Sequence, residues 1–305
     1  MSLVLLCPGQ GGQHPAMFDR VRGQATAQPV LQQLAAVLGA PAQDIAAGAE
    51  RFRNVRAQPL VCGGALAHWL ALRDALPRPL AVAGYSAGEL AAHAVAGSFS
   101  ATQCLSLAVQ RARLMDAASP GDAGLLAVLG LDRRSVDALC IAHGLAVAIV
   151  NGPDHVVLGG RRPALQALQA QATQSGARCV PLPVDVPAHT ALLHEAAVQF
   201  SRVLAGERLQ APTLPLLAGI DGRRVGSAAA VVDTLGAQIE QTVHWQAVIA
   251  QAVERGGRVF LELGPGSALA RRVLDLQPRL QARSVDDFQT LQGVVDWVAA
   301  ACARA

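Results

Sequence analysis

The sequence predicts an α/β protein in which a compact segment is inserted into a larger layer of alternating strands and helices. Three observations predict this class. A short apolar strand runs into a sharp turn at Gly84-Tyr-Ser-Ala-Gly88, and a helical pattern follows that turn. Residues 124–184 show a different order of elements from the chain around them. After His189 the alternation of helices and strands resumes.

The first part of the chain alternates buried strands with helices. Leu3 to Cys7 forms an apolar run that predicts a buried strand, and the Gly-rich loop PGQGGQ follows it. The remaining predicted elements before the insertion are a helical region at 32–76 interrupted at Pro41 and Pro59, a strand at 80–83, and helices at 87–96 and 101–118. A loop so rich in glycine lets its backbone approach another group closely, which indicates a functional role.

The inserted segment has the order strand, helix, strand, strand, helix, strand. Its predicted elements are strands at 125–129, 146–150, 156–159 and 178–184, with helices at 133–143 and 163–175. This order is that of a ferredoxin-like unit. The segment is therefore expected to form a compact unit between two parts of the larger layer.

The last part of the chain returns to the larger layer. Its predicted elements are a helix at 190–205, a strand near 214–218, a helix at 245–255, a strand at 259–263 and a terminal helix at 286–305. Leu263-Gly-Pro-Gly266 closes its strand in a tight turn.

The composition argues against several classes of protein. The 305 residues carry a net charge of +3 with no basic run longer than an arginine pair, which argues against nucleic acid as the main partner. No apolar stretch reaches the roughly 18 residues of a membrane span, and the start of the chain lacks the basic region of a signal peptide. The six cysteines have no CxxC spacing, so buried free thiols are expected rather than a metal site. We expect a cytoplasmic protein.

Ser86 is the strongest catalytic signal. Gly84 and Gly88 leave room for the sharp turn that raises a serine hydroxyl above a sheet at the start of a helix. The backbone N–H of Ala87 would then point at the oxyanion that develops during acyl transfer. A Gly-x-Ser-x-Gly pattern also arises by chance in a chain rich in Gly and Ala, but the preceding strand and following helix favour a nucleophile.

A serine nucleophile needs a base, and His189 is the best placed of the eight histidines. It lies where the chain returns from the insertion to the larger layer, a position at which a cleft between two units is expected. His194, about one turn further on, is a second candidate, whereas His93 lies about two turns beyond Ser86 and is too far along its helix. Asp185 is interpreted as a solvated loop residue, so no third member of a triad is evident.

Arg111 is a candidate for binding a substrate carboxylate. It lies within the helical pattern of residues 105–115, where the periodicity places it on one face with Leu107 and Leu114. An arginine that faces a cleft holds a carboxylate by two parallel hydrogen bonds, which lysine cannot reproduce. An ordinary surface arginine is the alternative, and the pattern alone leaves it open.

Six short motifs follow one another along the chain. They are PGQGGQ at 8–13, GYSAGE at 84–89, QRARLM at 110–115, NGPDHVVLGG at 151–160, VPAH at 186–189 and LGPG at 263–266. Together they resemble the malonyl-CoA:acyl carrier protein transacylase family, in the family's order and over nearly the whole chain. The resemblance implies an α/β-hydrolase-like core formed by residues 1–122 and 189–305, with a ferredoxin-like subdomain at 123–188.

The resemblance also implies how the nucleophile is activated. Ser86 is expected to carry the acyl group, and His189 to act as its base. The backbone carbonyl of Gln238 would orient the histidine in place of a triad acid, which accounts for the missing aspartate.

The same resemblance implies which residues bind the substrate. The backbone N–H groups of Gln10 and Ala87 would form the oxyanion hole, and Arg111 would bind the malonyl carboxylate. Three further residues that lie within the motifs are expected to contact the substrate: Gly9, Tyr85 and Asn151.

Some motifs depart from those of the fatty-acid enzymes. Tyr85, the only tyrosine, stands where the family usually has a histidine, and the loop GQGGQHPAMF lacks a serine after its second glycine and a glycine before its methionine. With IVNGPDHVVLGG and PAHTALL, these features look more like the epsilon subunit of bacterial malonate decarboxylase. Such subunits load malonyl groups from malonyl-CoA onto the modified thiol of a dedicated carrier protein. We prefer this subfamily, and a fatty-acid-synthesis transacylase is the alternative.

The expected reaction is a malonyl transfer by two half-reactions through one covalent intermediate. Malonyl-CoA and an acyl carrier protein are the expected partners, together with other malonate decarboxylase subunits. No metal or bound cofactor is expected, because the coenzyme A thioester is itself the substrate. Two rivals belong to other classes, namely a serine hydrolase or thioesterase and a non-catalytic scaffold that binds a carrier protein. The arginine and the missing acid disfavour the first, and the intact set of site residues disfavours the second. A polyketide-type acyltransferase is a further possibility, without a flanking module to support it.

Overall fold

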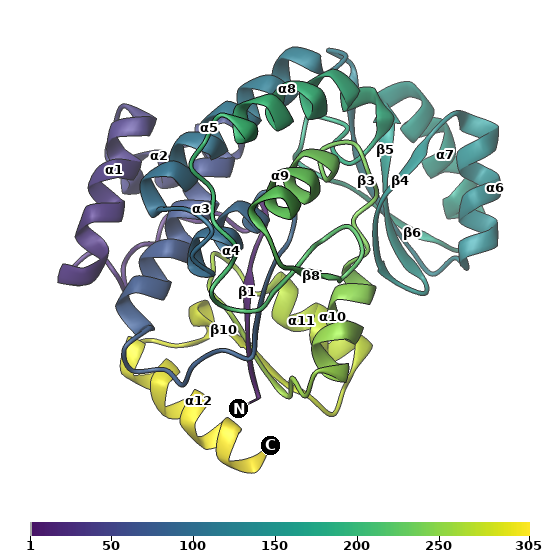
Figure 1. Cartoon of the computed structure of the whole chain (residues 1–305). Helices are drawn as coiled ribbons and strands as arrows, with labels where there is room; N and C mark the ends of the chain where they lie inside the picture. Colours follow the sequence, from purple (N-terminus) through teal and green to yellow (C-terminus); the bar gives the residue numbers. More distant parts are fainter. Residues whose placement is uncertain (1) are drawn as a thin grey trace.

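The computed structural model describes residues 2–305, which form a six-stranded sheet surrounded by helices and a second, four-stranded sheet beside it (Figure 1). The large sheet has the order β10-β9-β1-β2-β7-β8. Its strands are β1 (Leu3–Cys7), β2 (Ala81–Gly84), β7 (Leu216–Leu217), β8 (Arg224–Val225), β9 (Val259–Glu262) and β10 (Gln281–Ser284). All neighbours are parallel except β7 and β8. Every residue of β1, β2 and β9 is buried, which explains their nearly continuous apolar sequences.

Helices cover both faces of this sheet. They are α1 (Gln28–Leu38), α2 (Ala42–Ala47), α3 (Asn54–Leu72), α4 (Gly88–Val95), α5 (Ala101–Ala118), α8 (His194–Ala205), α9 (Ala228–Ala237), α10 (Trp245–Glu254), α11 (Ala268–Leu276) and α12 (Leu291–Arg304). Ser100 begins α5 with a capping box that it shares with Gln103. Helix α12 lies beside the N-terminus, at the end of the molecule away from the small sheet (Figure 1).

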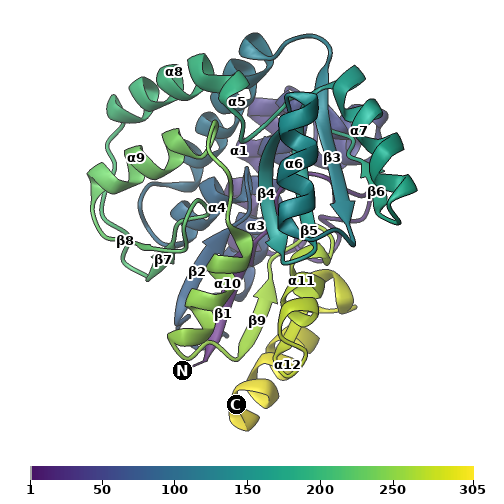
Figure 2. The same ribbon diagram turned by 90° about the vertical axis from the view of Figure 1, so that its right-hand side faces the viewer.

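The small sheet is antiparallel and has helices of its own. Its strands β3 (Ala123–Leu129), β4 (Ala146–Gly152), β5 (His155–Arg161) and β6 (Arg178–Pro181) pair in the order β4-β5-β3-β6. Helices α6 (Arg133–His143) and α7 (Arg162–Gln174) pack on one face around a separate apolar cluster, and Figure 2 shows them in front of this sheet. The side chains of Ala127, Ile149 and Val157 belong instead to the main core. The order of elements is the one that the sequence predicts.

The positions of the strand ends explain where a site can form. In β1 and β2, Cys7 pairs with Gly84, and β9 lies on the other side of β1. The Gly-rich loop, the Ser86 turn and the LGPG turn follow these three strands. Because the carboxyl ends of parallel strands meet at one edge, the three loops lie together, and ligands of open α/β sheets bind at such edges.

Several predicted boundaries are wrong. Helix α3 runs through Pro59, because losing one hydrogen bond near its start costs less than exposing its buried face. Strand β6 ends at Pro181 rather than at 184, since Pro181 and Pro183 interrupt the ladder. The helix predicted from 190 begins at His194 after a 3₁₀ turn, and the terminal helix begins at Leu291.

The described residues also bear on the expectations for membrane spans, free thiols and metal sites. Within residues 2–305 no helix is both long enough and apolar enough to cross a membrane. The expected cytoplasmic location stays a prediction. All six cysteines carry free thiols, and four of them are buried. The same residues contain no group of three His, Cys, Asp or Glu side chains arranged to hold a metal ion.

Candidate active site

Ser86 lies at the apex of a tight turn between β2 and α4. Its φ of +53° is in the left-handed region, which a non-glycine residue adopts only where its surroundings enforce it. A Cβ on Gly84 would lie 2.3 Å from the Cα of Glu89, and one on Gly88 would lie 2.3 Å from the carbonyl oxygen of Cys7. Both glycines are therefore required by close packing of the backbone, and the half-buried Ser86 stands at the N-terminus of α4.

His189 faces Ser86 and is held on two sides. Its Nε2 lies 2.8 Å from Ser86 Oγ, and its Nδ1 lies 2.5 Å from the carbonyl oxygen of Gln238. Its backbone N–H donates to the carbonyl of Ile239 at 2.8 Å, and its φ is +63°. A carbonyl oxygen only accepts, so the proton is assigned to Nδ1 and the lone pair of Nε2 faces the serine hydroxyl. The backbone of residues 238–239 thus orients the imidazole without a carboxylate.

The electrostatic environment keeps His189 neutral. Its side chain is 1% exposed, and burial lowers its pKa to about 3. The positive charge of Arg111 is the second cause of this lower pKa, while the hydrogen bond to Gln238 opposes both effects. A neutral imidazole with a free lone pair can accept the serine proton.

Arg111 is a buried residue of α5, so the surface alternative is wrong. It is 1% exposed, and burial lowers its pKa to about 10, which leaves it charged at neutral pH. Its Nη1 donates to Gln58 Oε1 and its Nη2 to Gln238 Oε1, both at 2.9 Å. Within residues 2–305 no carboxylate oxygen lies within ion-pair distance of the guanidinium. Three of its five N–H donors therefore make no hydrogen bond within the described residues.

The Gly-rich loop lies against the Ser86 turn. A Cβ on Gly9 would lie 2.8 Å from the carbonyl oxygen of Tyr85 and 3.6 Å from Ser86 Cβ, so the loop backbone reaches this turn only because residue 9 is glycine. Gln10 follows directly and is half-buried beside the nucleophile. Ala87 is the first residue beyond Ser86 and caps α4. The loop and the start of α4 therefore lie together at the Ser86 turn.

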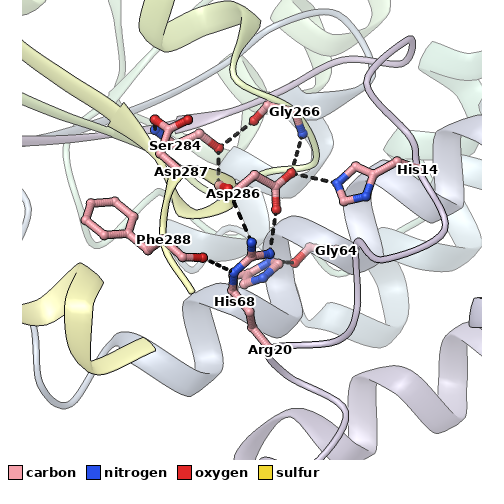
Figure 3. A network of polar contacts seen from close by, with 9 residues as sticks. All are labelled: His14, Arg20, Gly64, His68, Gly266, Ser284, Asp286, Asp287 and Phe288. Carbon is pink, nitrogen blue, oxygen red and sulfur yellow. Dashed lines mark hydrogen bonds and ion pairs between the residues drawn. The ribbon is translucent and has the colours of Figure 1, made fainter. Parts of the chain in front are cut away.

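A polar network behind the Gly-rich loop fixes it to the LGPG turn (Figure 3). The carboxylate of Asp286 accepts from His14 Nε2 at 2.8 Å, Arg20 Nη1 at 2.8 Å and the N–H of Gly266 at 2.6 Å. Arg20 also donates to the carbonyl of Phe288 at 2.6 Å. One half-buried carboxylate thus connects the segments that follow β1, β9 and β10, which sequence patterns did not reveal.

A cleft of about 450 Å³ opens between this edge of the large sheet and the small sheet. Gly9, Tyr85 and Asn151 line it, as do residues of the small sheet and of the LGPG turn. The Tyr85 hydroxyl donates to Asn151 Oδ1 at 3.1 Å, and Asn151 Nδ2 lies 3.4 Å from His155 Nε2. Three arginines line the same cleft, namely Arg178, Arg271 and Arg272. The cleft therefore borders the turn that carries Ser86, through Gly9 and Tyr85, and has basic side chains suited to an anionic ligand.

Comparison with known proteins assigns the family. The model of the acyl transferase domain matches residues 4–287. The chain belongs to this family. It is 33% identical to the malonyl CoA-acyl carrier protein transacylase of Mycobacterium bovis, over 95% of this chain and 99% of the relative. It is 30% identical to that of Salmonella typhimurium, over 88% of this chain and 91% of the relative. The protein is therefore an acyltransferase.

Solved structures of similar proteins share the fold of this acyltransferase. FabD from Acinetobacter baumannii superposes with a TM-score of 0.92 at 27% identity, over 98% of this chain and 99% of that one. The acyl-carrier-protein S-malonyltransferase from Burkholderia pseudomallei gives 0.91 at 30% identity, over 97% and 100%. A malonyl-transacylase solved in complex with a type II polyketide acyl-carrier protein also gives 0.91, at 27% identity over 97% and 99%.

The acyltransferase brings its predicted site residues together where the edge of the large sheet meets the small sheet, whereas the second candidate base His194 and the disfavoured residues lie elsewhere. His194 bonds to Glu240 on the surface, and His93 bonds to Ser98 inside the core. The side chain of Asp185 is 90% exposed, as expected of a solvated loop residue.

Sequence reasoning missed three polar residues of the acyltransferase site. Gln58 contacts Arg111, Glu89 contacts the side chain of Gln238, and His155 lies beside Asn151. Glu89 and His155 lie within the GYSAGE and NGPDHVVLGG motifs. Their places in these motifs were the available signal, whereas Gln58 carried none.

Proposed function

We propose that this acyltransferase moves a malonyl group from malonyl-CoA to the thiol of an acyl carrier protein, as an ester on Ser86. The observation that carries the proposal is the pair of half-buried Ser86 and buried, neutral His189, 2.8 Å apart, in one site with the guanidinium of Arg111. The names of the relatives described above, and of the complex with an acyl-carrier protein, support the substrate and the acceptor.

The first half-reaction forms the acyl-enzyme. His189 Nε2 takes the proton of Ser86 Oγ as the oxygen attacks the thioester carbonyl. The N–H groups of Gln10 and Ala87 stabilise the negative oxygen of the tetrahedral intermediate. The C–S bond then breaks, His189 returns its proton to the sulfur, and coenzyme A leaves.

The second half-reaction repeats these steps with a different thiol. The carrier thiol gives its proton to His189 and its sulfur attacks the ester carbonyl. The bond to Ser86 Oγ breaks and the serine regains its proton. Because the first product leaves before the second substrate enters, the kinetics are ping-pong.

Arg111 gives the site a preference for acyl groups that carry a carboxylate. Its open N–H donors can form a two-pronged contact with such a group. The bound carboxylate also neutralises the charge that lowers the pKa of His189. A malonyl group therefore raises the basicity of the catalytic imidazole as it binds, which an acetyl group cannot do.

The acceptor is the finer part of the proposal. The relatives described above are malonyl CoA-acyl carrier protein transacylases, so they favour the alternative over the malonate decarboxylase epsilon subunit. One observation keeps that subunit as a second candidate. Tyr85, which stands where the fatty-acid enzymes usually have a histidine, donates a hydrogen bond to Asn151 in the cleft. Other malonate decarboxylase subunits would then be partners as well.

A kinetic experiment tests the acceptor. Initial rates are measured while malonyl-CoA and a phosphopantetheine-bearing acyl carrier protein are varied together, and parallel double-reciprocal lines are expected. A malonate decarboxylase carrier serves as the competing acceptor. A rate with the acyl carrier protein no greater than hydrolysis in its absence would support a serine hydrolase, and no acylation at all would support a scaffold.

We also propose fold names for the two units. The first unit, residues 1–122 and 189–305, corresponds to an α/β-hydrolase-like core, supported by the serine turn between β2 and α4. Residue 1 lies outside the described part of the chain. Residues 123–188 correspond to a ferredoxin-like subdomain, supported by the strand order β4-β5-β3-β6.

A further inference from the structure

A buried carboxyl group that the mechanism does not use lies beneath the nucleophile. Glu89 is in the first turn of α4 and is 0% exposed. Its two carboxyl oxygens accept from the backbone N–H of Gly219 at 3.1 and 3.2 Å, and Oε2 also accepts from Gln238 Nε2. A Cβ on Gly219 would lie 2.5 Å from Glu89 Oε2. The surrounding backbone is thus shaped to admit this carboxyl group.

The side chain of Gln238 connects that carboxyl group to the arginine. Its Nε2 donates to Glu89, while its Oε1 accepts from Arg111 Nη2 at 2.9 Å. Gln238 is 1% exposed, and its own backbone carbonyl accepts from His189. One buried residue therefore contacts the base through its main chain and the arginine through its side chain.

The carboxyl group determines which way the amide of Gln238 points. An amide has donors at one end and an acceptor at the other. Turned around, its NH₂ group would face the guanidinium and its oxygen would face Glu89, so both contacts would be repulsive. An ionised Glu89 therefore keeps the oxygen of Gln238 directed at Arg111.

Charge balance supports the same arrangement. A buried guanidinium is costly without a compensating negative charge. Burial raises the pKa of Glu89 to about 7, whereas the hydrogen bonds from Gly219 and Gln238 and the charge of Arg111 favour its ionised form. The amide thus lies between two opposite charges, and each charge makes the hydrogen bond at its end stronger.

We propose that Glu89 is a positioning residue that, through the side chain of Gln238, orients Arg111 toward the carboxylate of the incoming acyl group. The inference rests on the proposed function, because that function gives Arg111 its ligand. Glu89 does not touch the substrate. It directs the open N–H donors of the arginine and thereby determines selectivity for carboxylated acyl groups.

The decisive variant is Gln238→Met, because it removes the side-chain amide and keeps the backbone carbonyl that holds His189. Two rates are compared with wild type. One is acylation of Ser86 by malonyl-CoA, and the other is its sulfonylation by phenylmethanesulfonyl fluoride, a neutral reagent that needs the serine and its base but not Arg111. Malonylation should fall roughly 10- to 100-fold, the effect of losing a hydrogen bond to a charged group. Sulfonylation should stay within about threefold of wild type, because the orientation of His189 is kept and the nucleophile loses only the long 3.3 Å contact between Gln238 Nε2 and the carbonyl oxygen of Ser86.

Glu89→Gln is the second variant and keeps the size of the side chain. It should change the same two rates in the same way, and it decides the matter if Gln238→Met fails to fold. Gln199→Met, on the exposed face of α8, is the matched control for the glutamine substitution and should change neither rate.

A double variant separates action through Arg111 from a general structural role. In an Arg111→Ala background, Gln238→Met should slow malonylation by less than about twofold, because the group it orients is already absent. The inference would be overturned if Gln238→Met slowed malonylation in the Arg111→Ala background as much as it does alone. It would also be overturned if the single variants lowered both rates equally or left malonylation unchanged. If wild type itself forms no malonyl-enzyme, the proposed function fails and this inference fails with it.

Discussion

Replacing Arg111 by Ala should reduce malonyl transfer far more than acetyl transfer. Arg111 is 1% exposed and has three N–H donors without a hydrogen-bond partner, so a malonyl carboxylate would form a buried ion pair with it. Removing one partner of such a pair costs about 2–5 kcal/mol, which is roughly 30- to 4,000-fold in rate. Acetyl-CoA lacks the carboxylate, and loss of the positive charge raises the pKa of His189. Acetylation should therefore fall by less than about threefold or increase.

The assay is rapid-quench acylation of Ser86 with each thioester, followed by intact-protein mass spectrometry. Arg113→Ala is the matched control, because Arg113 lies on the same helix with its side chain exposed. It should leave the ratio of malonyl to acetyl rates unchanged. Equal losses of both rates in Arg111→Ala would refute the carboxylate-binding role and the effect on the base.

Three further predictions concern stability. Gly88→Ala should prevent folding or destabilise the protein by more than about 4 kcal/mol, because its Cβ would lie 2.3 Å from backbone oxygen; near-normal thermal unfolding would contradict the close packing of the turn. Tyr85→Phe should lower the free energy of unfolding by about 1 kcal/mol through loss of the bond to Asn151, and urea titration measures this; no change would mean that the bond contributes nothing. The free energy of unfolding should also be greatest near about pH 6. Burial lowers the pKa of four histidines. Below about pH 6.5 the unfolded chain therefore binds more protons than the folded chain, and stability decreases as the pH is lowered. Burial raises the pKa of Glu89 to about 7 and of Glu262 to about 8, so above their ordinary values the folded chain binds more protons and stability falls as pH rises toward 8. Urea unfolding at about pH 4.5, 6 and 8 would contradict this balance if stability rose steadily across the series.

The sequence predicted the features that depend on local order. The Ser86 turn was found because a buried strand, a Gly-x-Ser-x-Gly segment and a helix follow one another directly. Strand β10 (Gln281–Ser284) was missed because it has little apolar alternation and is a strand only by pairing with β9. Helix α9 was missed because its Ala-rich segment has weak periodicity, whereas α11 is amphipathic but only nine residues long.

The site was predicted where a motif marks a residue, and it was missed where contacts are made across the chain. His189 was identified from its place at the end of the insertion. The partners of Glu89, by contrast, lie 130 and 149 residues away at Gly219 and Gln238. Only the packing of α4 beneath the segments that contain them brings these groups together. Such pairings are set by tertiary structure, which spacing along the sequence does not encode.

The most direct test of the account is intact-protein mass spectrometry after brief incubation with malonyl-CoA. A malonyl increment is expected on wild type and none on Ser86→Ala, and the increment on wild type should be lost when a phosphopantetheine-bearing carrier thiol is added. Absence of any covalent increment on wild type, or an increment that persists in Ser86→Ala, would contradict it.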